Sequence, residues 1–292
     1  MTAEDRMQQG DFEGALGILV AQNAAQPDPG QLLMQFSLEV RLQRFAAADQ
    51  TIRRIVQLAP EVAGPMQSFA ANARAEAAAT ARMTDPSLAG RRAGIGMPPP
   101  HALAYVKAAV HHAQGDHAGV VAALAEAKPL TPATPGTFTW RSGRTARFAS
   151  LVDSDDLTGP ILPCYERDTV LDLAYTQLRS ITFGEMKTSF DVMWIPAQIV
   201  PVEGNPMIVK VPAYHVGTGV AREASLRSGQ MTMWNHDRGY AEAIGQRDFA
   251  MLTAEGGKSM VGILQVGKIE FDAVTATSAS KPGFFKKLFG NN

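Results

Sequence analysis

The stretch QGDFEGAL at Gln9–Leu16 returns, in altered form, as QGDHAGVV at Gln114–Val121. Both copies follow the pattern Gln-Gly-Asp-x-x-Gly with two apolar residues after it. A glycine followed by an aspartate and then a periodic apolar run is typical of a turn that leads into a capped helix. The recurrence therefore predicts an internal repeat built from helix-turn-helix units.

Helical patterns continue between the two copies. Residues 32–42 fit one helix and residues 48–58 fit the next, which Pro60 ends. Between Phe69 and Arg82, eight of fourteen residues are alanine, the residue with the highest helix propensity. The first half of the chain is therefore predicted to be helical throughout.

The helix pairs resemble the tetratricopeptide (TPR) family. Ala48 and Pro60 stand twelve positions apart, as do the small residue of the second helix and the closing proline of that motif. The Trp-Leu-Gly-Tyr signature of its first helix is missing from the sequence. We expect residues 1–133 to form a TPR-like domain in which three units stack, with a plain helical bundle as the alternative.

Residues 134–277 have a different character, with many short runs of valine and isoleucine. Residues 137–141 and 145–152 flank Ser142-Gly143-Arg144, which is typical of a β-hairpin. Many short strands separated by turns predict a small barrel or a curled sheet. The predicted fold class is α+β, with a proline-rich linker from Pro129 to Gly136. Further strands are expected at 170–174, 178–183, 193–200, 207–211, 260–266 and 268–274, whereas 221–227 and 240–251 fit helix or loop.

The last fifteen residues, 278–292, differ from both domains. They contain three lysines, no acid and, at helical spacing, three phenylalanines and a leucine. A basic amphipathic segment suits an anionic membrane or a protein partner. At this length a free helix is marginal, so a loose or self-docked tail is the alternative.

The composition excludes several classes of protein. The chain has 292 residues, of which 46% are hydrophobic, and a formal net charge of −1. Such a balance gives no global basic field for nucleic acid. A single cysteine, Cys164, excludes an intramolecular disulfide framework and a cysteine-based zinc site. The first residues lack the apolar region of a signal peptide, and no segment reaches the roughly 18 apolar residues of a membrane helix, so we expect a cytoplasmic protein.

Motifs for catalysis and cofactor binding are incomplete. The GGKS run at residues 256–259 lacks the earlier glycine of a phosphate-binding loop, because Leu252 stands there. The sequence contains neither His-Glu-x-x-His nor Gly-x-Ser-x-Gly. We expect no catalytic residue, no cofactor and no metal. A hydrolase that uses the Asp153 region, Cys164 or His236 remains an alternative.

An ordered set of motifs in the second half is more specific. An acidic turn, DSDDLTGP, occupies Asp153–Pro160, and FDVMWIPA follows at Phe190–Ala197. PAY at Pro212–Tyr214 and GQR at Gly245–Arg247 close the set, with Trp234 between them. In this order the motifs resemble the ImpE family, also called TagJ, of type VI secretion accessory proteins.

The resemblance implies a non-enzymatic adaptor that binds the N-terminal helix of the small sheath subunit, TssB. It also implies an effect on sheath assembly or on recycling of the sheath by the ATPase ClpV. A groove between repeat helices is a natural dock for an amphipathic helix. A generic TPR-like scaffold for another protein is the alternative. Partner contacts are predicted at four residues that fit the core equally well: Phe36, Val40, Phe45 and Tyr105.

The residues that match the family motifs are expected to build the β-rich domain. They are Asp153, Asp155, Asp156, Gly159, Pro160, Trp194, Pro196, Pro212, Tyr214, Trp234, Gly245, Gln246 and Arg247. From charge alone, we expect Arg247 to pair with one of the three aspartates and to hold their turn against the Gly-Gln-Arg segment. The aspartates otherwise fit a solvated turn with side chain to backbone hydrogen bonds.

Overall fold

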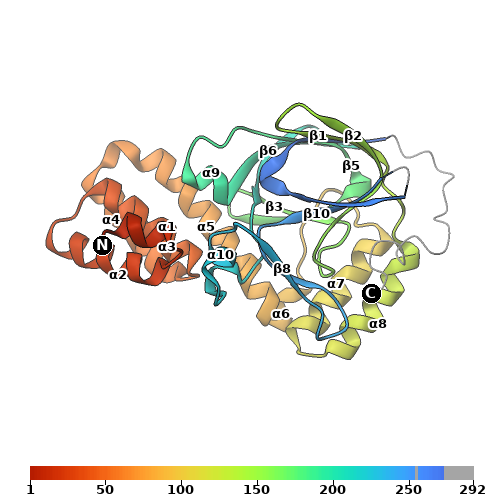
Figure 1. Ribbon diagram of the computed structural model, residues 1–292, viewed down its shortest axis with the longest axis horizontal. Helices are drawn as coiled ribbons and strands as arrows, with labels where there is room; N and C mark the ends of the chain where they lie inside the picture. The colour runs from red at the N-terminus through yellow and green to blue at the C-terminus, as the bar shows by residue number, and fades with distance from the viewer. Residues whose placement is uncertain (254–255, 273–292) are drawn as a thin grey trace.

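Helices fill the first part of the chain in the computed structural model, which describes residues 1–253 and 256–272 (Figure 1). The helices are α1 Ala3–Gln8, α2 Phe12–Ala25, α3 Pro29–Arg41, α4 Phe45–Leu58, α5 Ala63–Thr84, α6 Pro86–Ala89, α7 Pro100–Ala113 and α8 His117–Leu130. Because Pro129 lies inside α8, the connection to the first strand is shorter than the expected linker. The tail at 278–292 lies outside the described residues.

The two copies of the repeat have the same local structure, as predicted. Gly10 and Gly115 adopt left-handed φ angles of 72° and 73°. Asp11 then caps α2 by accepting a hydrogen bond from the Gly14 amide at 3.0 Å, and Asp116 caps α8 by accepting one from the Gly119 amide at 2.9 Å. A carboxylate at this position satisfies an amide that has no partner inside the helix.

The three helix pairs do not stack in one series, so that part of the prediction is wrong. Helices α1–α4 gather at one end of the molecule, and α6–α8 lie under the sheet (Figure 1). The 22-residue α5 lies between the groups and packs against α4, α6 and α7. The third pair therefore covers the β-rich part instead of the second pair.

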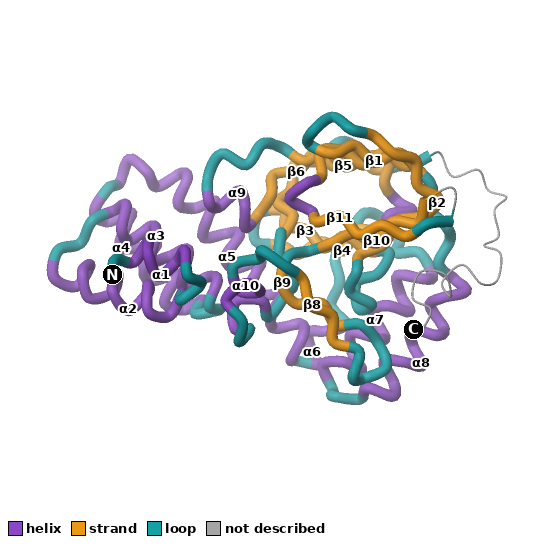
Figure 2. Tube along the Cα trace, in the orientation of Figure 1, coloured by secondary structure: helices purple, strands orange, loops and turns teal. Residues whose placement is uncertain are grey.

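The second part of the chain folds into a curled antiparallel sheet, which confirms the predicted fold class (Figure 2). Its ten strands follow the order β11-β10-β2-β1-β12-β5-β6-β7-β3-β4. The strands are β1 Gly136–Trp140, β2 Thr145–Asp153, β3 Ile161–Glu166, β4 Thr169–Ala174, β5 Leu178–Phe183, β6 Trp194–Pro201, β7 Met207–Pro212, β10 Asp248–Thr253, β11 Lys258–Gly262 and β12 Val266–Phe271. The predicted hairpin is present, because β1 pairs with β2 around Gly143. Residues 240–251 are largely strand, since the buried alternation there follows a period of two.

One segment leaves the large sheet after β7 and rejoins it at β10. It comprises residues 214–246, and we call it the strap. The strap carries the short helix α10 Ala224–Arg227 and a two-stranded sheet of β8 Thr232–Asn235 and β9 Glu242–Gly245. A further short helix, α9 Ser189–Met193, precedes β6.

The apolar core has a part inside the sheet and a part shared with the helices. Phe138, Leu162 and Ile199 are among the fully buried residues inside the curl. The shared part joins α3, α4 and α5 to the sheet through Trp194 and Phe190. Because burial of apolar area is the main stabilising contribution to folding, the shared cluster fixes α5 against the sheet.

The edge of the sheet at β4 is covered by the loop that precedes α7. Ala93 forms a parallel bridge with Leu171, and its carbonyl accepts a hydrogen bond from the Asp172 amide at 2.8 Å. Gly94 allows this approach, because a Cβ there would lie 3.0 Å from the Asp172 carbonyl oxygen. Arg92 completes the contact through an ion pair with the Asp172 carboxylate at 3.1 Å.

Candidate functional site

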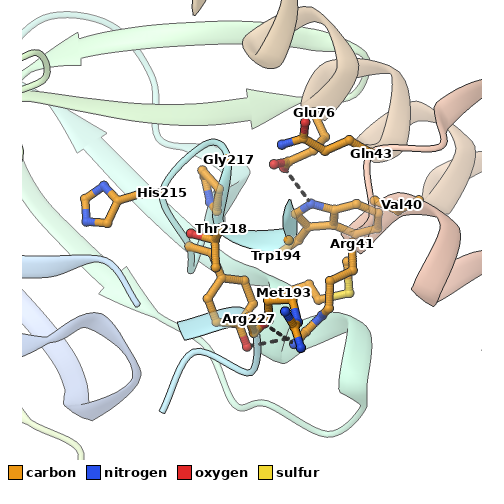
Figure 3. A pocket seen from close by; sticks show the side chains of 13 residues that line it. Val40, Arg41, Gln43, Glu76, Met193, Trp194, His215, Gly217, Thr218 and Arg227 are labelled. Atoms are coloured by element: carbon orange, nitrogen blue, oxygen red, sulfur yellow. Dashed lines mark hydrogen bonds between the residues drawn. The ribbon is translucent and has the colours of Figure 1, made fainter. Parts of the chain in front are cut away.

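Three parts of the chain meet in a pocket at the junction of helices, sheet and strap (Figure 3). The C-terminal end of α3 and Gln43 form one wall, and Glu76 of α5 forms another. The strap closes the pocket with Tyr214 and Gly219, among others. We call this the junction pocket. Gly219 is required by the close approach of two backbones, because a Cβ there would overlap the Arg41 carbonyl.

The Glu76 carboxylate is held by two neutral donors from the sheet. Tyr165 donates its hydroxyl hydrogen to Oε2 at 2.7 Å. The Trp194 indole N–H donates to the same oxygen at 3.2 Å (Figure 3). Burial raises the pKa of Glu76, and the two hydrogen bonds oppose that rise. The carboxylate therefore connects α5 with strands β3 and β6.

Arg41 is sandwiched between two aromatic rings. Its guanidinium lies 4.9 Å from the Phe12 centroid and 4.8 Å from the Tyr214 centroid. It also donates to the Arg227 carbonyl at 3.1 Å and to the Tyr214 hydroxyl at 3.3 Å. Such stacked cations are stabilised by the ring quadrupoles as well as by hydrogen bonds. The arrangement attaches α2 and α3 to the strap.

The acidic turn lies behind the junction pocket, and it is buried. Asp153 is 0% exposed and forms an ion pair with Arg247, which confirms the pairing expected from charge. The Arg247 Nε also donates to the Pro212 carbonyl at 3.1 Å. Since a buried ion pair needs its remaining polar atoms satisfied, these further bonds matter. The expectation of a solvated turn is wrong, because the turn is closed in by the strap.

The other two aspartates bind the backbone of the strap. Asp155 accepts hydrogen bonds from the Leu157 amide at 2.7 Å and the Ala243 amide at 3.0 Å. Asp156 accepts one from the Ala241 amide at 2.6 Å. Burial and the neighbouring Asp153 charge raise the pKa of Asp155 to about 7. The acidic turn therefore pairs with the outer edge of β9 and fixes the strap.

A second candidate site is an open groove between α4 and α5. The residues that line it stand at helical spacing on each helix, which gives each helix one continuous face. They are Asp49, Ile52, Arg53, Val56 and Gln57 on or beside α4, and Ala63, Gln67, Ala70 and Arg74 on α5. Ile52 and Ala70 form an apolar floor. Exposed charges stand at the rim, including Arg53 and Arg74.

Comparison with known proteins finds a family model that is similar to part of this chain. The family model described as "ImpE protein" matches residues 145–270, which include the acidic turn, Trp194 and Arg247. We call this matched region the ImpE domain. It is also 26% identical, over 237 residues, to a protein of Pseudomonas aeruginosa named "Type VI secretion system accessory component TagJ". That alignment covers 80% of this chain and 81% of the relative.

A solved structure has the same fold over most of the chain. It is the crystal structure of protein VPA1032 from Vibrio parahaemolyticus, with a TM-score of 0.80. The likeness covers 94% of this chain and 99% of that chain at 14% sequence identity. The arrangement of the helices and the curled sheet is therefore shared by another protein.

Most of the motif residues of the ImpE domain lie around the acidic turn or the junction pocket. Gly159 has a φ of 46°, and a Cβ there would lie 2.6 Å from the Tyr105 ring. The Pro160 carbonyl accepts a hydrogen bond from the Tyr175 amide at 3.0 Å. Gly245 has a φ of 108°, and the Gln246 side chain donates to the Gly229 carbonyl at 2.9 Å. These residues shape turns and connections of the ImpE domain.

Two motif residues lie apart from these centres. Pro196 is partly exposed in β6 and lies beside Gly184. Trp234 is partly exposed in β8, where it pairs with Ala243 of β9. The motif residues therefore follow one another in the sequence but do not form one contiguous cluster in the structure.

The predicted partner contacts fall mainly in the core. Phe36, Val40 and Tyr105 are 0%, 2% and 6% exposed, and Phe45 is partly exposed. Phe36 and Val40 belong to the cluster shared with the ImpE domain, and Tyr105 packs on Gly159. Val40 also lines the junction pocket, and none of the four lines the α4–α5 groove, so their role in partner binding stays a prediction. Apolar residues recur along a helix at the same spacing whether they face the core or a docked partner, so the sequence pattern does not distinguish the two roles.

Of the regions named for the hydrolase alternative, the acidic turn and His236 lie near one another: burial raises the pKa of Asp156, and the His236 charge opposes that rise. Cys164 is 0% exposed among apolar residues of the sheet, and burial raises the pKa of its thiol. His236 is exposed on the strap. In the described ranges, no group of three or more His, Cys, Asp or Glu side chains could hold a metal ion. Over the same residues, every helix is too short or too polar to cross a membrane.

Sequence reasoning missed the residues that join the helices to the ImpE domain. Glu76 was hidden in the alanine-rich segment, although it and Asn72 stand four positions apart on that helix. Polar residues at this spacing on an otherwise apolar face are a signal of a buried polar contact. Arg41 and Arg227 carried no comparable signal, because their partners are backbone carbonyls and rings from distant segments.

Proposed function

We propose that this chain is a non-enzymatic accessory component of a type VI secretion system and acts in the cytoplasm. In this proposal it binds the N-terminal helix of the small sheath subunit, TssB, and thereby modulates sheath assembly or recycling by ClpV. The helical residues 1–133 supply the docking surface, and the ImpE domain holds them in place. The likeness to TagJ over 80% of the chain supports the secretion role.

The α4–α5 groove is the observation that carries the docking proposal. Its apolar floor, formed by Ile52 and Ala70, matches the apolar face of an amphipathic helix. Arg53 is largely exposed at the rim, and Arg74 is exposed on the opposite helix. Each forms an exposed ion pair within the chain, Arg53 with Asp49 at 2.6 Å and Arg74 with Asp168 at 3.8 Å. Because exposed pairs are weak, acidic residues beside the apolar stripe of a partner helix could take the place of these partners.

Calorimetric titration of the full chain with a peptide of the TssB N-terminal helix tests the partner. We expect saturable binding that is absent with a scrambled peptide of the same composition. If the native-sequence peptide does not bind at high micromolar concentration, the partner is wrong, and a generic scaffold for another protein becomes the better description.

A pair of matched variants tests the groove. Val56→Glu places a charge in the α4 face of the groove, and Val20→Glu places one on α2, outside the groove, where the valine is 46% exposed. We expect Val56→Glu to weaken peptide binding by about tenfold or more, which is about 1.4 kcal/mol per factor of ten. Val20→Glu should leave the affinity unchanged. Equal affinities for both variants would place the docking surface elsewhere.

A further inference from the structure

The strap contacts both copies of the internal repeat, at opposite ends of the helical part (Figure 2). At the first copy, the Arg227 guanidinium donates to the Gly10 carbonyl at 2.9 and 3.2 Å. At the second copy, the Tyr240 hydroxyl lies 3.1 Å from Nδ1 of both His112 and His117. One segment of the ImpE domain is thereby attached to two helix-turn-helix units.

Alignment of the two copies shows which residues make these contacts. His112 and His117 stand at the positions that Met7 and Phe12 hold in the first copy. Met7 and Phe12 belong to an apolar cluster, whose packing does not depend on pH. The capping aspartate also has a different ion-pair partner in each copy: Arg6 in the first and His111 in the second. All three differences replace a residue that is insensitive to mild acid with a histidine.

We propose that Tyr240, His112 and His117 form a proton-controlled latch that holds the strap on the second copy and releases it in mild acid. The first copy has no corresponding sensitivity in this scheme, because Arg227 is cationic at every relevant pH. Protonation therefore loosens one end of the strap while the other end stays attached. The proposal concerns the strap and does not depend on which partner the α4–α5 groove binds.

The hydrogen-bonding capacity of Tyr240 explains the latch. A phenol has one O–H to donate and an oxygen that accepts. With neutral rings, it can donate to one Nδ1 and accept from the Nδ1–H of the other. When His112 is protonated, its Nδ1 is a donor and no longer accepts from the Tyr240 hydroxyl.

The surrounding charges determine the sign of the effect. Burial lowers the pKa of His112; Glu242, at 3.3 Å, opposes this shift, and Arg238 and His117 reinforce it. The neutral ring is therefore favoured in the folded protein. Its stabilising contribution is complete above the unfolded pKa of about 6.5 and declines as the pH falls below that value. The charged or titratable groups around the latch are His111, His112 and His117 of the repeat, Asp116 of its turn, Arg238, Tyr240 and Glu242 of the strap, and Asp155 of the acidic turn.

Hydrogen exchange of the full chain at pH 7.5 and 5.5 tests the latch, with rates corrected for the intrinsic pH dependence of exchange. We expect protection of residues 232–245 to fall by about tenfold for each proton taken up per pH unit below 6.5. Protection of the central strands β5 and β6 should stay constant. A strap whose protection is the same at both pH values would overturn the proposal.

Residues of the first copy provide the decisive variant. His112→Met combined with His117→Phe should remove the pH dependence of the strap, and a dependence that persists would contradict the latch. If this double variant does not fold, His112→Gln keeps hydrogen-bonding atoms without a proton that titrates, and it should reduce the pH dependence. Tyr240→Phe should lower protection of the strap at pH 7.5 toward the wild-type level at pH 5.5. An unchanged strap in Tyr240→Phe would also overturn the proposal.

Discussion

Two carboxylates, the buried Asp153 and the half-buried Glu76, hold the molecule together by different means. Asp153 lies at the end of β2 and faces a cation, Arg247, which is 3% exposed. Glu76 lies on α5 and faces two neutral donors, Tyr165 and Trp194. The first contact is internal to the ImpE domain, and the second joins that domain to the helices.

The difference shows how each contact should respond to change. Removal of one member of a buried ion pair leaves the other charge without compensation, which is strongly destabilising. A carboxylate held by neutral donors can instead take up a proton. The raised pKa of Glu76 favours this protonated form. The contact inside the domain should therefore be sensitive to loss of charge, and the contact between the parts should be sensitive to loss of a hydrogen bond.

The largest effect is expected at Arg247. Arg247→Met should lower the free energy of unfolding by about 3–5 kcal/mol, because the Asp153 charge remains buried without its partner. Urea denaturation measures the loss. Arg147→Met is the matched control, because Arg147 forms an exposed ion pair with Asp272, and such pairs contribute little to stability. Equal losses in the two variants would contradict the distinction between buried and exposed pairs.

A smaller effect is expected at the Glu76 contact. Tyr165→Phe removes one of the two donors and should cost about 1–2 kcal/mol in the same experiment. Tyr175→Phe is the control, because the Tyr175 hydroxyl is buried and makes no hydrogen bond within the described part of the chain. That substitution should be neutral or stabilising. If Tyr175→Phe lowers the free energy of unfolding as much as Tyr165→Phe does, the hydrogen bond from Tyr165 to Glu76 is not the cause of the loss.

The smallest effect is expected when the Glu76 charge alone is removed. Glu76→Gln keeps an oxygen that accepts from Tyr165 and Trp194, so stability should change by less than about 1 kcal/mol at neutral pH. Because the folded pKa of Glu76 is raised, its stabilising contribution is complete below the unfolded pKa and declines as the pH rises. Melting temperatures at pH 5 to 8 should therefore favour Gln increasingly with pH. If the melting temperature of Glu76→Gln instead falls further below that of the wild type toward pH 8, the raised pKa of Glu76 is contradicted.

Local patterns in the sequence predicted local structure well. The Gly-Asp pairs of the repeat specified a left-handed turn and a capped helix, because both depend on neighbouring residues only. The hairpin at Gly143 follows for the same reason. The pairing of Arg247 with an aspartate was also predictable, since a buried guanidinium needs an anion and three were available in one motif.

Long-range placement was not predictable from these patterns. Apolar periodicity identifies a face of a helix but does not say whether another helix, a sheet or a partner covers it, and Phe36 and Val40 illustrate this. The burial of the acidic turn depends on the strap, whose β9 lies more than 80 residues further along the chain. Glu76 found its donors on strands that the alanine-rich helix gives no means to anticipate.

The bridge between Ala93 and Leu171 also has a consequence for behaviour at high concentration. An uncovered edge strand offers its amides and carbonyls to any other extended chain, which is a common route to aggregation. Here the loop before α7 uses part of the β4 edge as a partner within the same molecule, and Gly94 is the residue that allows it to lie so close. The loop thus prevents part of the β4 edge from pairing with a strand of another molecule.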